Sequence, residues 1–195
     1  MLTTEIIKQL NEHNTIIIDT EKLIPNIIDS ILLLVACFTN KKKVILFGNG
    51  GSAADAQHIA GEFVGVLRRT NPRPPLNAIT LTTNTSVLTA LVNDNAVDEI
   101  FTRQLEACAE PGDIAIGIST SGNSENIRLA IKQAKELGCR TIGLLGCNGG
   151  SIASEVDVAI IVPSEDTPRI QEVHITVGHI ICDLVEQRLR ANGVI

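Results

Sequence analysis

The chain has 195 residues, 44% of them hydrophobic, which is enough for one domain with a single buried core. Its formal net charge is -6 and it has no block of basic residues, which argues against a nucleic-acid or membrane surface, because both require clustered Lys and Arg. Only 2% of the residues are aromatic, with no Trp or Tyr, so binding by base stacking is not expected.

The cysteines and the N-terminus indicate the cytoplasm. The sequence begins Met-Leu-Thr-Thr-Glu, without the basic stretch and apolar run of a signal peptide, and the apolar run at 27–38 is too short and interrupted to span a bilayer. An odd number of widely spaced cysteines without a CxxC pair predicts reduced thiols. The cysteines are Cys37, Cys108, Cys139, Cys147 and Cys182.

The first 40 residues are expected to be helical. Apolar residues recur at helical spacing over 4–38, and Pro25 interrupts the pattern, which predicts two consecutive helices. We expect this segment to pack on the core or on a partner subunit.

Short apolar runs follow, with the composition of strands that are buried on both faces. Most lead through a Gly, Ser or Thr turn into a helical stretch, which is typical of a doubly wound α/β fold. We therefore predict one domain over 1–195 with a five-stranded parallel sheet and flanking helices, in an order that this pattern does not determine. The predicted strands are 44–47, 78–81, 114–118, 141–145 and 158–162.

The first strand leads into a glycine-rich loop, Gly48-Asn49-Gly50-Gly51-Ser52, with a helix expected from Ala53. Such a loop lets backbone N–H groups approach an anion at a helix N-terminus. Its glycine spacing also fits a loose dinucleotide fingerprint, but the second strand lacks the acidic residue that would hold a ribose. A simple turn without a ligand remains an alternative.

A second loop, residues 119–124, contains four hydroxyl side chains and one glycine between a predicted strand and a helix. Hydroxyl and amide donors of this density can surround a phosphate without any Lys or Arg. The alternative is that one of these residues only caps the helix. The donors are Ser119, Thr120, Ser121 and Ser124.

Two helices carry candidate acid, base and metal-ligating groups. His58 and Glu62, at i and i+4 on a helix over 53–67, can share a metal, although a surface contact between them is equally plausible. A long final helix from about 167 to 190, with Asp166 or Thr167 as its cap and Pro168 in its first turn, carries further candidates.

The candidates on this final helix are Gln171, Glu172, His174 and His179. By helical angle Glu172 lies closer to His179 than Gln171 does, and the pattern does not settle which of the two acts. His13 and His174 are interpreted as structural or solvated.

Three separated motifs in this order resemble the phosphoheptose (sedoheptulose 7-phosphate) isomerases of the sugar isomerase (SIS) domain superfamily. They are residues 48–58 (GNGGSAADAQH), 118–124 (ISTSGNS) and 169–175 (RIQEVHI), with similarity over nearly the whole chain. The resemblance implies a flavodoxin-like SIS fold and an aldose–ketose isomerase. The implied reaction converts sedoheptulose 7-phosphate to D-glycero-D-manno-heptose 7-phosphate, the first step of bacterial heptose synthesis for lipopolysaccharide cores.

The same resemblance implies site residues and an assembly. Glu62 and His179 would be the acid/base pair of an enediolate mechanism, and one zinc ion per subunit would be bound in a homotetramer with active sites between subunits. The implied zinc ligands are His58, Glu62, Gln171 and His179. The implied substrate contacts are Asn49, Gly50, Gly51, Glu62, Asn93, Asp94, Ser119, Thr120, Ser121, Ser124 and Gln171.

The chain departs from the usual family pattern at Asn95, where Tyr is common, and at Gly61, where Glu or Ala is usual. Two other functions remain open: a non-catalytic SIS-domain protein that binds the replication initiator, and a sugar-phosphate sensor. Neither needs an acid/base pair, whereas this chain has Glu62 and His179 in the matching places.

Overall fold

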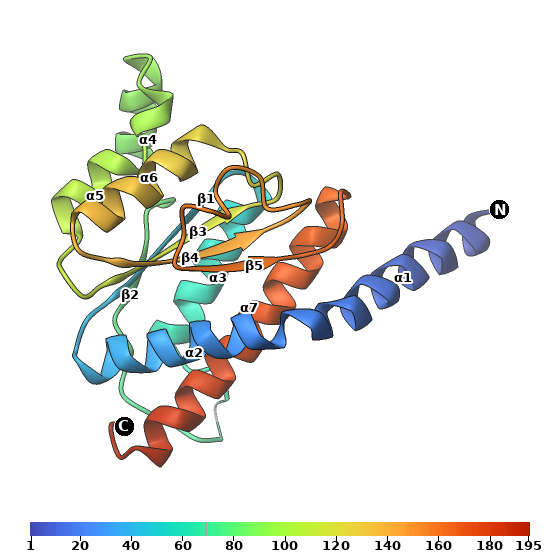
Figure 1. Cartoon of the computed structure of the whole chain (residues 1–195), viewed down its shortest axis with the longest axis horizontal. Helices are drawn as coiled ribbons and strands as arrows, with labels where there is room; N and C mark the ends of the chain where they lie inside the picture. The colour runs from blue at the N-terminus through green and yellow to red at the C-terminus, as the bar shows by residue number, and fades with distance from the viewer. Residues whose placement is uncertain (69) are drawn as a thin grey trace.

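Five parallel strands form one sheet between two layers of helices, as the apolar runs predict (Figure 1). The computed structural model describes residues 1–68 and 70–195. The strand order is β2-β1-β3-β4-β5, and every neighbouring pair is parallel. The strands are β1 (Val44–Gly48), β2 (Ala78–Thr80), β3 (Ile114–Ser119), β4 (Arg140–Leu145) and β5 (Val158–Ile161).

Burial on both faces explains why these strands could be predicted to within one residue at either end. Every residue of β1 and of β3 is buried, so each strand reads as an unbroken apolar run. Successive side chains point to opposite faces: Val44 and Leu46 enter one core cluster, and Ile45 and Phe47 enter the other. The doubly wound α/β fold is therefore confirmed.

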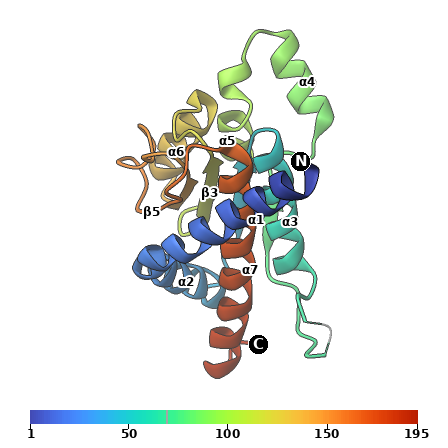
Figure 2. The same ribbon diagram turned by 90° about the vertical axis from the view of Figure 1, so that its right-hand side faces the viewer.

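The two helical layers differ in what they carry. α2, α3 and α7 cover one face of the sheet, while α5 and α6 cover the other (Figures 1 and 2). The helices are α1 (Leu2–Asp19), η1 (Thr20–Leu23), α2 (Ile24–Thr39), α3 (Gly51–Val64), α4 (Thr85–Asn93), η2 (Val97–Glu99), α5 (Thr102–Cys108), α6 (Glu125–Glu136) and α7 (Thr167–Ala191).

The N-terminal segment forms the two predicted helices, with Pro25 in the first turn of α2. α2 buries Ile27, Ile31 and Leu34 against the core, whereas α1 buries no residue and extends away from the sheet (Figure 1). The helical run Leu2–Thr39 contains an 18-residue window that is apolar enough to cross a bilayer by length and composition. Core helices also meet that criterion, and α2 packs as one.

Helix α7 begins at Thr167 with Asp166 at its N-cap position, as predicted, but the Asp166 side chain makes no capping hydrogen bond. Its carboxylate instead lies 3.8 Å from Nε of Arg169. Pro168 lies in the first turn, where its missing N–H costs nothing.

The stretch between β2 and β3 had no detailed prediction. It forms α4, η2 and α5, and α4 stands out from the rest of the molecule in both views (Figures 1 and 2). No residue of α4 is buried. Asn84 caps this helix by accepting a hydrogen bond of 3.2 Å from the Val87 N–H.

The side chain of His174 is fully buried under the sheet. Its Nε2 lies 3.0 Å from the carbonyl oxygen of Leu145, to which it donates as a neutral imidazole, and this agrees with the structural role expected for His174. Its Nδ1 is buried without a hydrogen-bond partner among the described residues. Burial therefore lowers the pKa of His174 from 6.5 to about 4.

This shift predicts a pH dependence of stability. The unfolded chain protonates His174 near its ordinary pKa of 6.5, above the folded value of about 4, so the contribution is complete above pH 6.5 and is lost as the pH falls. Between pH 7.5 and 4.5 we expect it to lower the free energy of unfolding by about 2–3 kcal/mol. Urea unfolding at both pH values, at one protein concentration, measures this.

The matched control is His174→Gln, which keeps an N–H donor for Leu145 but does not titrate. Carboxylates contribute equally to the acid sensitivity of both proteins, so the difference between them isolates His174. Equal losses of stability in the two proteins would show that His174 does not titrate as inferred.

Candidate functional site

The two predicted ligand-binding loops lie at the carboxyl edge of the sheet, directly after β1 and β3. These strands are neighbours, and the chain leaves β1 for β2 on one side and β3 for β4 on the other. In open α/β sheets such a reversal leaves a crevice between two loops, where ligands commonly bind. Here the two loops are residues 48–52 and 119–124.

The first loop requires glycine at two positions, and a third glycine packs against the Gln171 amide. Gly50 has φ +56°, a conformation that side-chain-bearing residues rarely adopt. A Cβ on Gly48 would lie 2.6 Å from the Ser52 carbonyl oxygen, and one on Gly51 would lie 2.5 Å from Nε2 of Gln171. The helix begins at Gly51, two residues before the predicted Ala53, so its first amides lie within the loop.

The second loop keeps its hydroxyl groups available. Ser124 is the N-cap residue of α6, but its side chain does not cap the helix and lies 3.0 Å from Oγ of Ser119 instead. Thr120 and Ser124 are half-buried, and Ser121 is exposed. The geometry therefore does not show Ser124 capping the helix, and the first amides of α6 have no side-chain cap.

A neighbouring turn supports the serine loop from behind. The Ile152 N–H donates to the Gly122 carbonyl at 3.0 Å, and the Ser151 N–H donates to Oδ1 of Asn123 at 2.9 Å. Gly122 has φ +66°, and a Cβ there would lie 2.2 Å from the Gly149 carbonyl oxygen. No larger residue fits at Gly122 without moving this turn.

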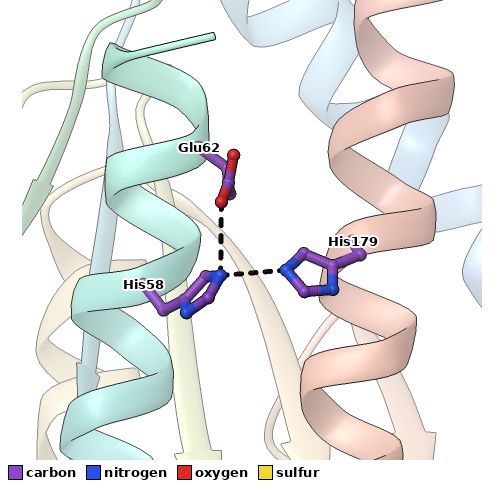
Figure 3. A group of neighbouring side chains, drawn as sticks. All are labelled: His58, Glu62 and His179. Atoms are coloured by element: carbon purple, nitrogen blue, oxygen red, sulfur yellow. Dashed lines mark hydrogen bonds and ion pairs between the residues drawn. The ribbon is translucent and has the colours of Figure 1, made fainter. Parts of the chain in front are cut away.

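Three of the predicted acid/base and metal-binding residues converge between α3 and α7 (Figure 3). Nε2 of His58 lies 2.9 Å from Nε2 of His179 and 3.2 Å from Oε1 of Glu62. One ligand atom from each residue lies within 4.8 Å of the others. Two imidazole nitrogens and a carboxylate oxygen form a donor set that suits a divalent cation such as zinc.

A glycine lets the two helices approach closely enough for this convergence. Gly178, next to His179, faces Ile59, next to His58, and a Cβ on Gly178 would lie 2.8 Å from Cδ1 of Ile59. Real Cβ contacts are not that short, so a side chain here would force the Ile59 side chain to move and would strain the packing of α3 against α7.

Buried Arg73 fastens the C-terminal end of α3 to α7. Its guanidinium donates to the carbonyls of Glu62 and Phe63, both at 2.9 Å, where the helix dipole favours a cation. Its Nε donates to Glu186 of α7 at 2.7 Å, and both side chains are at least nine-tenths buried. Loss of one partner of such a pair costs about 3–5 kcal/mol.

The structure separates the two candidates that the sequence left open on α7. Glu172 binds His13 at 2.7 Å and Arg169 at 2.9 Å, so its carboxylate is held against α1 and outside the cluster. The Gln171 amide lies against Gly51 at the start of α3. Of the two, Gln171 is the one beside the first loop.

Asn93 and Asp94 are not brought to the cluster within one chain. They lie at the end of the protruding α4, are exposed, and hydrogen-bond to each other at 3.2 Å. Asn95, which departs from the family pattern, has φ +57°, and Asn tolerates this conformation better than most side chains.

Three residues near the site were missed by the sequence analysis. Asp55, one turn before His58, has one buried carboxylate oxygen without a partner among the described residues, and burial raises its pKa while His58 opposes the rise. Its spacing from His58 was the available signal. Arg73 and Asn126 gave no signal, because their partners are distant in sequence.

Comparison with known proteins identifies relatives over most of the chain. The SIS domain family model matches residues 10–146. A phosphoheptose isomerase from Geotalea daltonii is 53% identical over 186 residues, covering 95% of this chain and 96% of that protein.

Two solved structures share the fold. Phosphoheptose isomerase from Neisseria gonorrhoeae gives a TM-score of 0.90 at 39% identity, covering 96% of this chain and 100% of the other. The enzyme from Francisella tularensis gives a TM-score of 0.91 at 32% identity, covering 96% and 99%.

Two glycine substitutions test the helix packing. Gly178→Ala should separate α3 from α7, lowering stability by about 1–3 kcal/mol and reducing turnover, because His58 and His179 lie beside this contact. A Cβ on the exposed Gly61 meets no atom within 4 Å, so Gly61→Ala should stabilise α3 by about 0.5–1 kcal/mol. Urea unfolding and a turnover assay on both variants measure these effects, and a Gly178→Ala protein with unchanged stability and turnover would contradict the packing argument.

Proposed function

Because the chain belongs to the SIS domain family and is a sugar-phosphate isomerase, we propose that it interconverts sedoheptulose 7-phosphate and D-glycero-D-manno-heptose 7-phosphate. The observation that carries this proposal is the convergence of His58, Glu62 and His179 between α3 and α7. We further propose that the product enters bacterial heptose synthesis for lipopolysaccharide cores in the cytoplasm. We favour this function over a non-catalytic initiator-binding protein or a sugar-phosphate sensor, because the relatives are phosphoheptose isomerases.

The proposed chemistry is a proton transfer through an enediolate. Glu62 takes a proton from C1 of the ketose and returns it to C2 of the aldose product, or the reverse. His179 moves the accompanying proton between the two oxygens, because its Nε2 faces the same space as the Glu62 carboxylate. Both residues lie on helices, which hold reacting groups more rigidly than loops do.

The proposed phosphate site uses no Lys or Arg from either loop. Ser119, Thr120, Ser121 and Ser124 donate hydroxyl groups, and the uncapped start of α6 adds backbone N–H groups and the positive end of its dipole. In the same proposal Asn49, Gly50 and Gly51 approach the sugar from the first loop, together with Gln171. In this proposal the phosphate lies over the end of β3 and the reacting carbons lie toward α3 and α7.

We propose that His58, Glu62, Gln171 and His179 hold one zinc ion per subunit. The three residues of the cluster present the nitrogen and carboxylate donors that zinc prefers, and Gln171 lies beside the first loop. When bound, zinc would act as a Lewis acid that polarises the substrate carbonyl and stabilises the developing negative charge.

A homotetramer with active sites between subunits is the proposed assembly. The first two helices expose large apolar residues that one chain leaves uncovered, and Asn93 and Asp94 lie too far out on α4 to reach the cluster of their own chain. The proposed tetramer would be overturned if light scattering of the purified protein gave the mass of a single subunit. The exposed apolar residues of these helices include Ile6, Ile7, Leu10, Ile18, Ile24, Ile28 and Leu32.

Glu62→Gln tests the acid/base assignment. It should reduce turnover of sedoheptulose 7-phosphate by about 10²–10⁴-fold with the unfolding midpoint nearly unchanged, because the amide keeps the shape but cannot take a proton. The matched control is Glu172→Gln, which alters a carboxylate held outside the cluster and should keep turnover near that of the unmodified protein. Undiminished turnover in Glu62→Gln would remove Glu62 from the mechanism.

Metal content tests the zinc proposal independently of activity. Elemental analysis of protein purified without chelators should find about one zinc per subunit, and His58→Ala should lower that content, since it removes one of the ligand nitrogens. Chelation should abolish turnover, and added zinc should restore it. A chelated, metal-free protein with full activity would refute the proposed role of His58 and Gln171.

A further inference from the structure

Two asparagines join the loops on either side of the crevice. Nδ2 of Asn49 donates to Oδ1 of Asn126 at 2.9 Å, and Nδ2 of Asn126 donates back to Oδ1 of Asn49 at 3.1 Å. The residues are 77 positions apart in the sequence. Asn126 lies in the first turn of α6 and is only 8% exposed.

This amide pair continues the connection between β1 and β3 beyond the point where the strands part. The last paired residues of the two strands are Gly48 and Ile118. Asn49 comes directly after Gly48, and Asn126 belongs to the helix that follows the serine loop. The pair therefore spans the crevice in which the substrate is proposed to bind.

The two hydrogen bonds fix the orientation of the Asn49 amide. Each amide donates one hydrogen bond and accepts one, which only a second amide, or a group with the same donor and acceptor pattern, can match. Because Asn126 is buried, it cannot exchange this partner freely for water. Asn49 keeps one N–H and one lone pair for a ligand.

We propose that Asn126 is a positioning residue for substrate binding, which holds the Asn49 amide toward the sugar and sets the distance between the glycine loop and the serine loop. This inference rests on the proposed function, in which both loops bind one sugar phosphate. Asn126 itself does not touch the substrate, so its effect passes through Asn49.

A double-mutant cycle on Asn49→Ala, Asn126→Ala and the double variant tests the proposal. Asn126→Ala should raise KM for sedoheptulose 7-phosphate about tenfold with kcat changed much less, because the loops bind the substrate without moving its protons. In the Asn49→Ala background, Asn126→Ala should add little further change. The proposal would be overturned if the KM increases of the two single variants multiplied in the double variant. It would also be overturned if Asn126→Ala left KM unchanged.

Two further variants keep the result interpretable. Asn126→Asp has the same shape but replaces one donor with an oxygen that faces Oδ1 of Asn49, so it should raise KM even if Asn126→Ala does not fold. Gln133→Ala, two turns further along α6, is the matched control and should leave KM and kcat unchanged. Unfolding midpoints measured for all variants separate loss of fold from loss of binding.

A failure of the proposed reaction can be distinguished from a failure of the positioning role of Asn126. If the unmodified protein does not convert sedoheptulose 7-phosphate, the reaction assignment fails, and the same cycle is then measured as the Kd of sedoheptulose 7-phosphate by calorimetry. Weaker binding of this sugar phosphate in Asn126→Ala, without a further loss in the double variant, would still support the positioning role. Equal affinity in all variants, or no binding by the unmodified protein, would reject it.

Discussion

The close approach of α3 and α7 is the constraint on which the site depends. Gly178 leaves no side chain between the helices at Ile59, and this brings His58 and His179 within 2.9 Å. The buried pair of Arg73 and Glu186 closes the same junction at its other end and caps the last carbonyls of α3. A packed glycine and a buried ion pair therefore define one rigid helix pair, and the proposed proton transfers occur across it.

The sheet places the second half of the site opposite this helix pair. Its order, with β1 beside both β2 and β3, opens a crevice at the carboxyl edge, and both loops at that crevice require glycine for close approach. The helix pair lies on one face of the sheet, and the serine loop follows β3 at the carboxyl edge. In the proposed function one sugar phosphate contacts both.

The sequence pattern correctly predicted the elements that are determined by residues close together in the chain. The central strands β1 and β3 were found because burial on both faces makes them unbroken apolar runs. The switch from α1 to α2 was found because Pro25 interrupts a helical pattern. α4 was missed because it is short and buries no residue fully: only Leu88 and Leu91 pack, partly buried, against the core. Helical angle favoured Glu172 over Gln171, but angle ignores competing partners, and His13 and Arg169 hold Glu172 elsewhere. Arg73 and Asn126 depend on contacts between distant segments, which periodicity cannot reveal.

The division of the site between helices and loops has a consequence for how this fold diversifies. The acid/base candidates are fixed by helix packing, while the groups suited to recognise the phosphate and the sugar come from two loops outside that packing. Changes in the loops can therefore alter which sugar phosphate fits, while the proton-transfer geometry stays intact. In this architecture the residues that set the type of reaction and the residues that set the substrate range can change independently. A new substrate specificity can therefore arise while the reactive residues stay the same.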